Sequence, residues 1–182
     1  LPTSGPEISQ CYQLLRRWLD LRQHPEKRKP VTLALDNQTL LTHARSTELL
    51  VIRDDLLLQP PLTTLESGTI RCSVLRTAET LSTLHIPYVI ALTPDKTTAY
   101  QPYLADASIR NRQATVELLG AEAIPHVINM LPAFRSELAN GTRDLYLPND
   151  SHWGHAGSRL AAALIEAELQ SQWPIQTPAS AQ

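Results

Sequence analysis

The sequence lacks most of the features that assign a protein to a class at once. It carries 16 basic and 18 acidic residues among 182, a net charge of −2, and so has no positive excess for binding nucleic acid or an anionic membrane surface. No apolar run approaches the ~20 residues that cross a membrane. There is also no internal repeat, signal peptide or glycine-rich phosphate loop. With 42% hydrophobic residues, the chain is expected to form one globular domain with a sizeable core.

Cysteine is scarce, and its two positions leave the redox compartment open. Cys11 and Cys72 fit one disulfide of an exported protein. They fit two buried thiols equally well, because each lies on the apolar side of a predicted helix. The sequence begins at Leu1 rather than at Met. We therefore expect that an N-terminal segment, where an export signal or membrane anchor would lie, has been removed.

Hydrophobic periodicity predicts helices that alternate with short apolar strands. The expected helices span residues 7–22, 70–84, 107–122, 132–139 and 156–170. The expected strands span residues 31–35, 49–52, 88–92, 127–130 and 145–147. This alternation predicts an α/β fold, a three-layer αβα sandwich with a mostly parallel sheet of about five strands. We expect an N-terminal helix and linker over 1–30, the domain over 31–171, and a flexible tail over 172–182.

The most informative stretch is the polar loop over residues 149–157, which precedes the last predicted helix. A carboxylate two residues before a histidine, in an extended loop, can face the same way as the imidazole. Asp150 can then accept a hydrogen bond from one ring nitrogen of His152, while the other nitrogen faces a substrate or a hydroxyl group. Trp153 and two nearby glycines suggest a walled pocket. The alternative is that Asp150 or Ser151 caps the final helix and that His152 is incidental.

These residues resemble a known family. Asp150-Ser-His-Trp153, followed by an alanine-rich helix, is similar to the Asp-Thr-His-Trp signature of the alginate O-acetyltransferase branch of SGNH hydrolases, the AlgX/AlgJ type. Residues 89–100 resemble the family's strand that ends in Pro-Asp-Lys and leads to a tyrosine. Residues 124–134 resemble its strand followed by a helix that opens on Leu-x-Pro. The likeness covers residues 31–170 and is weakest at the opening strand.

The resemblance implies a catalytic pair. Asp150 would orient His152, and His152 would be the general base that activates a serine and later protonates the leaving oxygen. In this family the serine follows in a Gly-Asp-Ser-like turn, which the sequence lacks. The wider superfamily places it after the first strand, where residues 35–39 contain no serine. We therefore expect the serine to be supplied by sequence outside this chain or to be lost.

The other hydroxyl residues that we considered lack a glycine-flanked elbow, point away from the pair or lie within a helix. They are Thr39, Ser46, Ser67, Ser73, Ser151 and Ser158.

Three further residues are candidates for binding substrate: Trp153, Lys96 and Tyr100. Lys96 could present a cation, or its loop could support the pocket, although Pro-Asp-Lys is also ordinary turn chemistry. Tyr100 could stack on a sugar ring, although such residues more often anchor a loop. His152, His155 and Asp150 have side chains of the types that bind zinc, but no distant third or fourth ligand stands out. We expect no metal and no cofactor.

The leading functional prediction is O-acetyl transfer to, or removal from, an extracytoplasmic polysaccharide. The expected location is the periplasm or another extracytoplasmic site, and a membrane-bound acyl-transfer protein is a candidate partner. The alternative is a non-catalytic domain that binds glycan or serves as a scaffold in a polysaccharide acetylation complex.

Overall fold

The computed structural model describes residues 30–36, 39–43, 46–52, 55, 63–114, 116–117 and 124–173. The predicted helix over 7–22, Cys11, and the predicted tail beyond residue 173 lie outside the described residues. None of the described helices combines the length and the apolar composition that crossing a bilayer requires.

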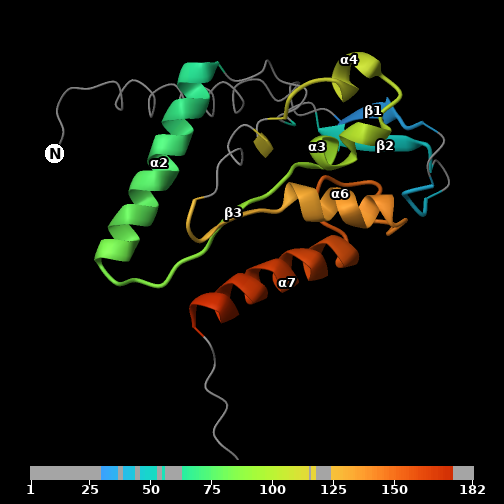
Figure 1. Cartoon of the computed structure of the whole chain (residues 1–182). Coiled ribbons are helices and arrows are strands. Elements are labelled where there is room, and N and C mark those ends of the chain that lie inside the picture. Colours follow the sequence, from blue (N-terminus) through green and yellow to red (C-terminus); the bar gives the residue numbers. More distant parts are fainter. Residues whose placement is uncertain are drawn as a thin grey trace, which may run out of the picture.

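The described strands form two separate pairs (Figure 1). β1 (Pro30–Ala34) pairs with β2 (Glu48–Ile52) in antiparallel register, with Thr32 opposite Leu50. No described helix lies between them, and a connection without a helical crossover is typical of antiparallel strands. β3 (Ile90–Leu92) pairs with β4 (Val127–Asn129) in parallel register. Their connection contains helices, as parallel strands require.

The predicted α/β class is therefore confirmed, but the described strands do not form the expected single, mostly parallel sheet. The predicted strand over 145–147 contains only an isolated antiparallel bridge, between Tyr146 and Trp153. Because the bridge joins Tyr146 to a residue within the polar loop, it closes the chain back on itself there instead of extending a sheet.

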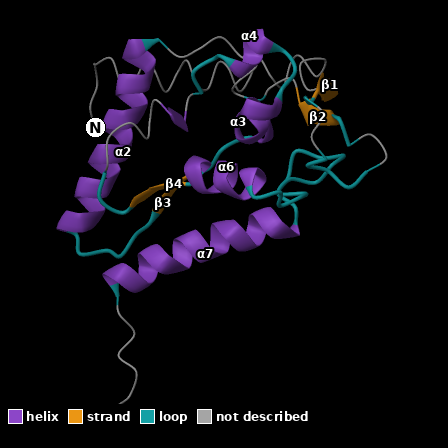
Figure 2. Cartoon of the chain, turned by 45° about the vertical axis from the view of Figure 1, so that its right-hand side comes forward, coloured by secondary structure: helices purple, strands orange, loops and turns teal. Residues whose placement is uncertain are grey.

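α2 (Thr64–Thr83) stands at one side of the molecule (Figures 1 and 2). It begins six residues before the first apolar position that predicted it, because Thr63 and Glu66 form a capping box. Ala78 is its one fully buried residue. Cys72 is a free, exposed thiol, so the prediction that it faces the apolar side of a helix was wrong. The apolar positions of α2 are too few on one face to bury the helix deeply.

Among its described residues, the crossover from β3 to β4 holds α3 (Lys96–Tyr100), the 3-10 turn η3 (Gln101–Tyr103) and α4 (Ala107–Arg110), and residues 116–117 are also helical. A single helix over 107–122 was predicted, but α4 ends at Arg110 and residues 111–114 are not helical; residues 115 and 118–122 of the predicted helix lie outside the described residues. The side-chain amide of Gln101 donates to the carbonyl oxygens of Ile109, at 3.2 Å, and Arg110, at 3.1 Å. These bonds satisfy the carbonyl groups that a longer helix would have used.

α6 (Leu131–Ala139) lies between α3 and α7 (His155–Gln172), as Figures 1 and 2 both show. Both helices begin and end within two residues of their predicted bounds. The core between them is aromatic. The ring centroid of Phe134 on α6 lies 5.9 Å from that of Tyr146 and 5.8 Å from that of Trp153. The ring centroids of Tyr146 and Tyr100 of α3 lie 6.1 Å apart. Because Tyr146 precedes the polar loop and Trp153 belongs to it, this aromatic cluster packs the loop against α6.

Candidate active site

The candidate site is the loop between Tyr146 and the start of α7. Two backbone hydrogen bonds draw it closed: Leu147 N–H donates to His152 O at 2.9 Å, and Gly154 N–H donates to Leu145 O at 2.9 Å. The hydroxyl group of the buried Tyr146 donates to the carbonyl of Pro94 after β3. The loop is therefore anchored both to itself and to the end of the parallel strand pair.

Asp150 and His152 meet within this loop as predicted. Nδ1 of His152 lies 2.7 Å from Oδ1 of Asp150. An ionised carboxylate only accepts hydrogen bonds, so Nδ1 carries the proton and donates it. The backbone N–H of Ser151, at 2.5 Å, and that of His152, at 3.3 Å, donate to the same oxygen. The bond from the imidazole, followed by those from the backbone, lowers the pKa of Asp150. The carboxylate therefore stays ionised at neutral pH.

The rest of the imidazole is open to solvent, because the side chain of His152 is 81% exposed. In the part of the chain that the structure describes, no hydroxyl group hydrogen-bonds to Nε2. α7 is capped by Gly154, without a side-chain hydrogen bond. The capping alternative for Asp150 and Ser151 is therefore wrong, since α7 begins too far along the chain for either to reach its first N–H groups.

A cavity of about 500 Å³ adjoins the pair. Side chains from β2, the end of β3, the start of α3, the loop and α7 surround it. Its lining comprises Ile52, Asp55, Thr93, Pro94, Asp95, Lys96, Tyr146, Ser151, His152, Trp153 and Ser158. The mixture of aromatic, carboxyl and hydroxyl groups suits a polar ligand such as a sugar.

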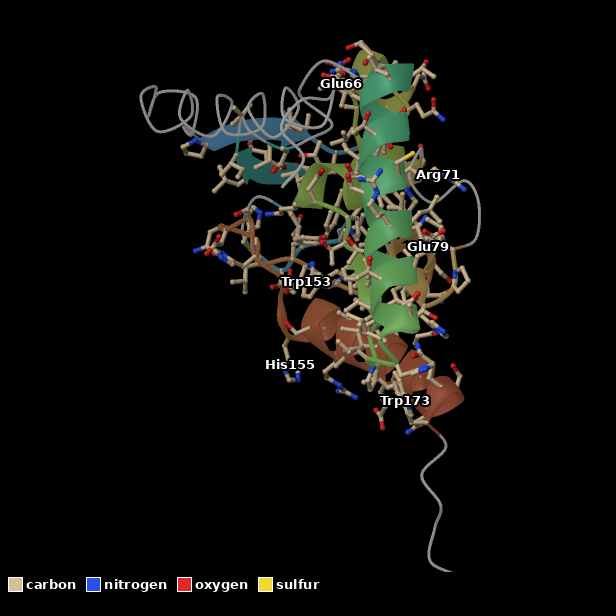
Figure 3. The ribbon with its side chains drawn as sticks, turned by 90° about the vertical axis from the view of Figure 1, so that its left-hand side faces the viewer. Glu66, Arg71, Glu79, Trp153, His155 and Trp173 are labelled. Atoms are coloured by element: carbon tan, nitrogen blue, oxygen red, sulfur yellow. The ribbon has the colours of Figure 1, made fainter. Side chains whose placement is uncertain are left out.

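Trp153 lies in the wall of this cavity. It is half-buried, with one side against Phe134. In Figure 3, Trp153 lies above the start of α7, and His155 extends outward from the first turn of that helix. His155 is exposed and is not part of the cavity lining. Trp153 and His152 therefore line the same cavity, whereas His155 lies outside that cavity.

The two glycines after Trp153 make the close approach that their positions suggested. A Cβ atom at Gly154 would lie 2.1 Å from the carbonyl oxygen of Asp144, and one at Gly157 would lie 2.1 Å from that of Leu145. Only glycine lets α7 lie this near the preceding segment.

Lys96 does not have the substrate-binding role predicted for it. Lys96 borders the cavity, but the residue is 1% exposed, and among the described residues its ammonium group donates only to backbone carbonyl oxygens. Burial lowers the pKa of Lys96 to about 8, against the opposing attraction of Asp55, Asp150 and Asp144. The prediction was wrong because the residue's position just after a strand does not reveal whether its side chain turns inward.

Tyr100 is likewise not available to stack on a sugar ring. It is 0% exposed and packs edge-on against Tyr146. Burial raises the pKa of its hydroxyl group, which stays protonated. Its place is in the core beneath the site, which matches the alternative interpretation that it anchors a loop.

Asp55 lines the cavity, and no sequence pattern identifies it as a candidate. It is 5% exposed and accepts a hydrogen bond from the hydroxyl group of Thr97. Burial, and to a smaller extent the nearby Asp95, raises the pKa of Asp55 to about 6, despite the Thr97 hydroxyl. No motif surrounds Asp55, and its bonding partner is 42 residues away, so no local signal could have found it.

Within the described residues, no group of three or more histidine, cysteine, aspartate or glutamate side chains could hold a metal ion. Asp150, His152 and His155 do not converge into a ligand set: the first two bond to each other, and His155 extends to solvent.

Comparison with known families identifies the domain. A family model described as the SGNH hydrolase-like domain of the acetyltransferase AlgX matches residues 58–182. The chain belongs to this family. The match contains Pro94-Asp95-Lys96 and the Asp150–Trp153 motif, so the resemblance predicted from the sequence is confirmed. β1, β2 and Asp55 precede the matched residues. No curated protein and no solved structure matches the chain.

Membership of the AlgX-type family supports a role in polysaccharide acetylation. The match covers well over half of the chain and includes the whole of the loop that carries Asp150 and His152.

Proposed function

We propose that this domain acts in the transfer of an O-acetyl group to, or its removal from, an extracytoplasmic polysaccharide, with His152 as general base and Asp150 as its orienter. The observation that carries the proposal is the 2.7 Å bond from Nδ1 of His152 to Asp150, which leaves Nε2 facing outward beside a cavity. An imidazole held in one tautomer by a carboxylate contributes roughly 10²–10⁴-fold to proton transfer.

The chemistry proceeds in two balanced halves. Nε2 of His152 takes the proton of a serine hydroxyl as its oxygen bonds to the acyl carbon, and the resulting oxyanion is stabilised by backbone N–H groups. The proton then passes to the leaving oxygen as its bond to the acyl carbon breaks. In the second half, a sugar hydroxyl or water loses its proton to Nε2 and displaces the serine oxygen, which recovers the proton.

The proposed chemistry requires a serine nucleophile, and no serine among the described residues hydrogen-bonds to His152. Ser151 and Ser158 line the cavity, but neither donates to His152 among the described residues. Ser151 lies between the pair, where its hydroxyl is 3.5 Å from Asp150 instead. The finer architecture that we propose is the three-layer αβα sandwich of SGNH hydrolases, to which the pair β3–β4 contributes parallel strands.

Trp153 is proposed to present its ring to a sugar of the substrate, because it is half-buried in the cavity wall. The proposed location is extracytoplasmic, with a membrane-bound acyl-transfer protein as partner and without a cofactor.

The test is turnover of p-nitrophenyl acetate by the complete gene product and by three variants. His152→Ala and Asp150→Asn are expected to lose roughly 10²-fold or more of kcat/KM. His155→Ala is the matched control, since its imidazole lies three residues away and extends to solvent; it should behave as wild type. Equal turnover by wild type and His152→Ala would overturn the assignment of the base.

The second candidate is a non-catalytic domain that binds glycan or serves as a scaffold in an acetylation complex. The absence of a hydroxyl group at Nε2 among the described residues favours it. It predicts no turnover in any variant, together with oligosaccharide binding that weakens in Trp153→Ala.

A further inference from the structure

The ammonium group of Lys96 occupies the centre of a cluster of carbonyl oxygens. Nζ lies 2.8 Å from Leu50 O, 2.8 Å from Leu147 O, 3.0 Å from Asp150 O and 3.2 Å from Pro148 O. An ammonium group has three N–H donors, so four acceptors use all of them. Because Lys96 is 1% exposed, bulk water does not reach the ammonium group to replace these bonds.

Three of the four oxygens belong to the loop that carries the acid-base pair, and the fourth belongs to β2. Among the described residues, the backbone of the loop and its flank supplies the bonds from Leu147 N–H to His152 O and from Gly154 N–H to Leu145 O, both at 2.9 Å, and a longer one from Asp150 N–H to Leu147 O, at 3.3 Å. Lys96 therefore supplies three loop contacts and ties the loop to a strand almost a hundred residues earlier.

The positive charge of Lys96 also stabilises the cluster of carbonyl oxygens. Carbonyl oxygens carry partial negative charge and repel one another when they converge on one point. A cation at that point turns the repulsion into attraction, and hydrogen bonds that involve an ionised group are roughly twice as strong as neutral ones. Without the ammonium, these oxygens would separate or admit water, and Asp150, whose own carbonyl is one of them, would move with the backbone.

Lys96 is itself held in place. It is the first residue of α3, whose cap Asp95 accepts from the N–H of Thr98 at 2.7 Å and from the Thr98 hydroxyl at 3.0 Å. α3 packs against both β2 and α6. The ammonium group thus projects from a fixed helix start toward a loop that lacks regular secondary structure.

We propose that Lys96 is a positioning residue, which fixes the backbone at Leu147, Pro148 and Asp150 so that the Asp150 carboxylate meets Nδ1 of His152. The functional consequence rests on the proposed function, whereas the placement of the carboxylate does not. Lys96 does not touch substrate and takes no part in proton transfer.

The experiment measures the pKa of the Asp150 carboxyl by ¹³C NMR in wild type and variants. Because the imidazole bond is the main cause that lowers this pKa below 3.8, its loss is directly visible. In Lys96→Met, which keeps the apolar stem without the donors, the pKa should rise toward the value found in His152→Ala. The control is Arg135→Met. This residue of α6 is a half-buried cation that also donates to backbone, at 3.3 Å from Thr98 O, and its side-chain partners among the described residues, Glu117 and Gln101, lie outside the loop.

A folded Lys96→Met protein in which the pKa of Asp150 equals that of wild type would refute the proposal. So would a shift of equal size in Arg135→Met, since that would show a general loss of structure. Lys96→Gln, a neutral donor, should give an intermediate shift. If neither Lys96 variant folds, the proposal is also overturned, because it places the effect in the loop and not in the core.

Kinetics provide the second readout wherever acyl transfer is measurable. Lys96→Met should lower kcat by roughly 10²-fold with little change in KM, because positioning of the base acts in the transition state. If neither the wild type nor any variant shows turnover, that result counts against the proposed function alone. The NMR shift of Asp150 still decides the role of Lys96.

Discussion

Replacing Gly157 by alanine tests the close approach between α7 and the segment that precedes the polar loop. A Cβ atom there would lie 2.1 Å from the carbonyl oxygen of Leu145 and 3.0 Å from its carbon. Non-bonded carbon atoms prefer about 3.5–4.0 Å, so one segment must move by roughly 1 Å. Both partners are backbone, and neither can rotate away as a side chain would.

The magnitude follows from three contributions. Overpacking of this kind costs about 1–3 kcal/mol. Displacing Leu145 also weakens the bond from Gly154 N–H to Leu145 O, at 2.9 Å, which contributes about 1 kcal/mol. Alanine is the better helix former by about 1 kcal/mol, which offsets the second contribution. Gly157→Ala should therefore lower the free energy of unfolding by about 1–3 kcal/mol.

Gly68→Ala is the matched control. Gly68 lies inside α2, and a Cβ atom there would have no neighbour within 4 Å. The same substitution should raise the free energy of unfolding by about 0.5–1 kcal/mol. Thermal unfolding would resolve the two, because 1 kcal/mol shifts Tm by about 2–4 °C in a domain of this size. A Gly157→Ala protein as stable as wild type, beside a stabilised Gly68→Ala, would refute the predicted clash.

Three other substitutions give distinct outcomes. The pKa of Asp55 is raised to about 6 in the folded protein from 3.8, so the folded state holds this proton to higher pH and stability falls as pH rises from about 4 to 6. Asp55→Asn should remove that fall in urea titrations and stabilise the protein at pH 7 by up to about 3 kcal/mol; unchanged pH dependence would contradict the assignment. Phe134→Ala should cost about 3–5 kcal/mol and shift tryptophan emission to longer wavelength, because Trp153 loses its ring neighbour at 5.8 Å; unchanged emission would place Trp153 elsewhere. Thr63→Ala should cost about 1 kcal/mol through loss of the α2 capping box, whereas no loss would show that α2 begins elsewhere.

The parts of the structure that depend on nearby residues were predictable. α6 and α7 show helical periodicity over their own length, and the bond between Asp150 and His152 joins residues two apart in one loop. The glycine at 157 could be connected with close packing because few other residues permit it.

The errors arose where distant segments decide the outcome. The carbonyl partners of Lys96 lie 46 to 54 residues away, so nothing around Lys96 shows that its side chain turns inward. Tyr100 is buried by Tyr146, which lies far along the chain. Within the helix predicted over 107–122, α4 ends at Arg110, where Gln101 donates to the carbonyl groups of Ile109 and Arg110. The antiparallel return of β2 also depends on pairing that no local pattern encodes.

The most direct test of the central claim is intact-mass measurement of the complete gene product after treatment with a serine-directed fluorophosphonate. If His152, oriented by Asp150, activates a serine, the wild-type protein gains the mass of one phosphonyl group. His152→Ala should gain none over the same time, and His155→Ala should gain as much as wild type. Labelling of His152→Ala at the wild-type rate would contradict the account.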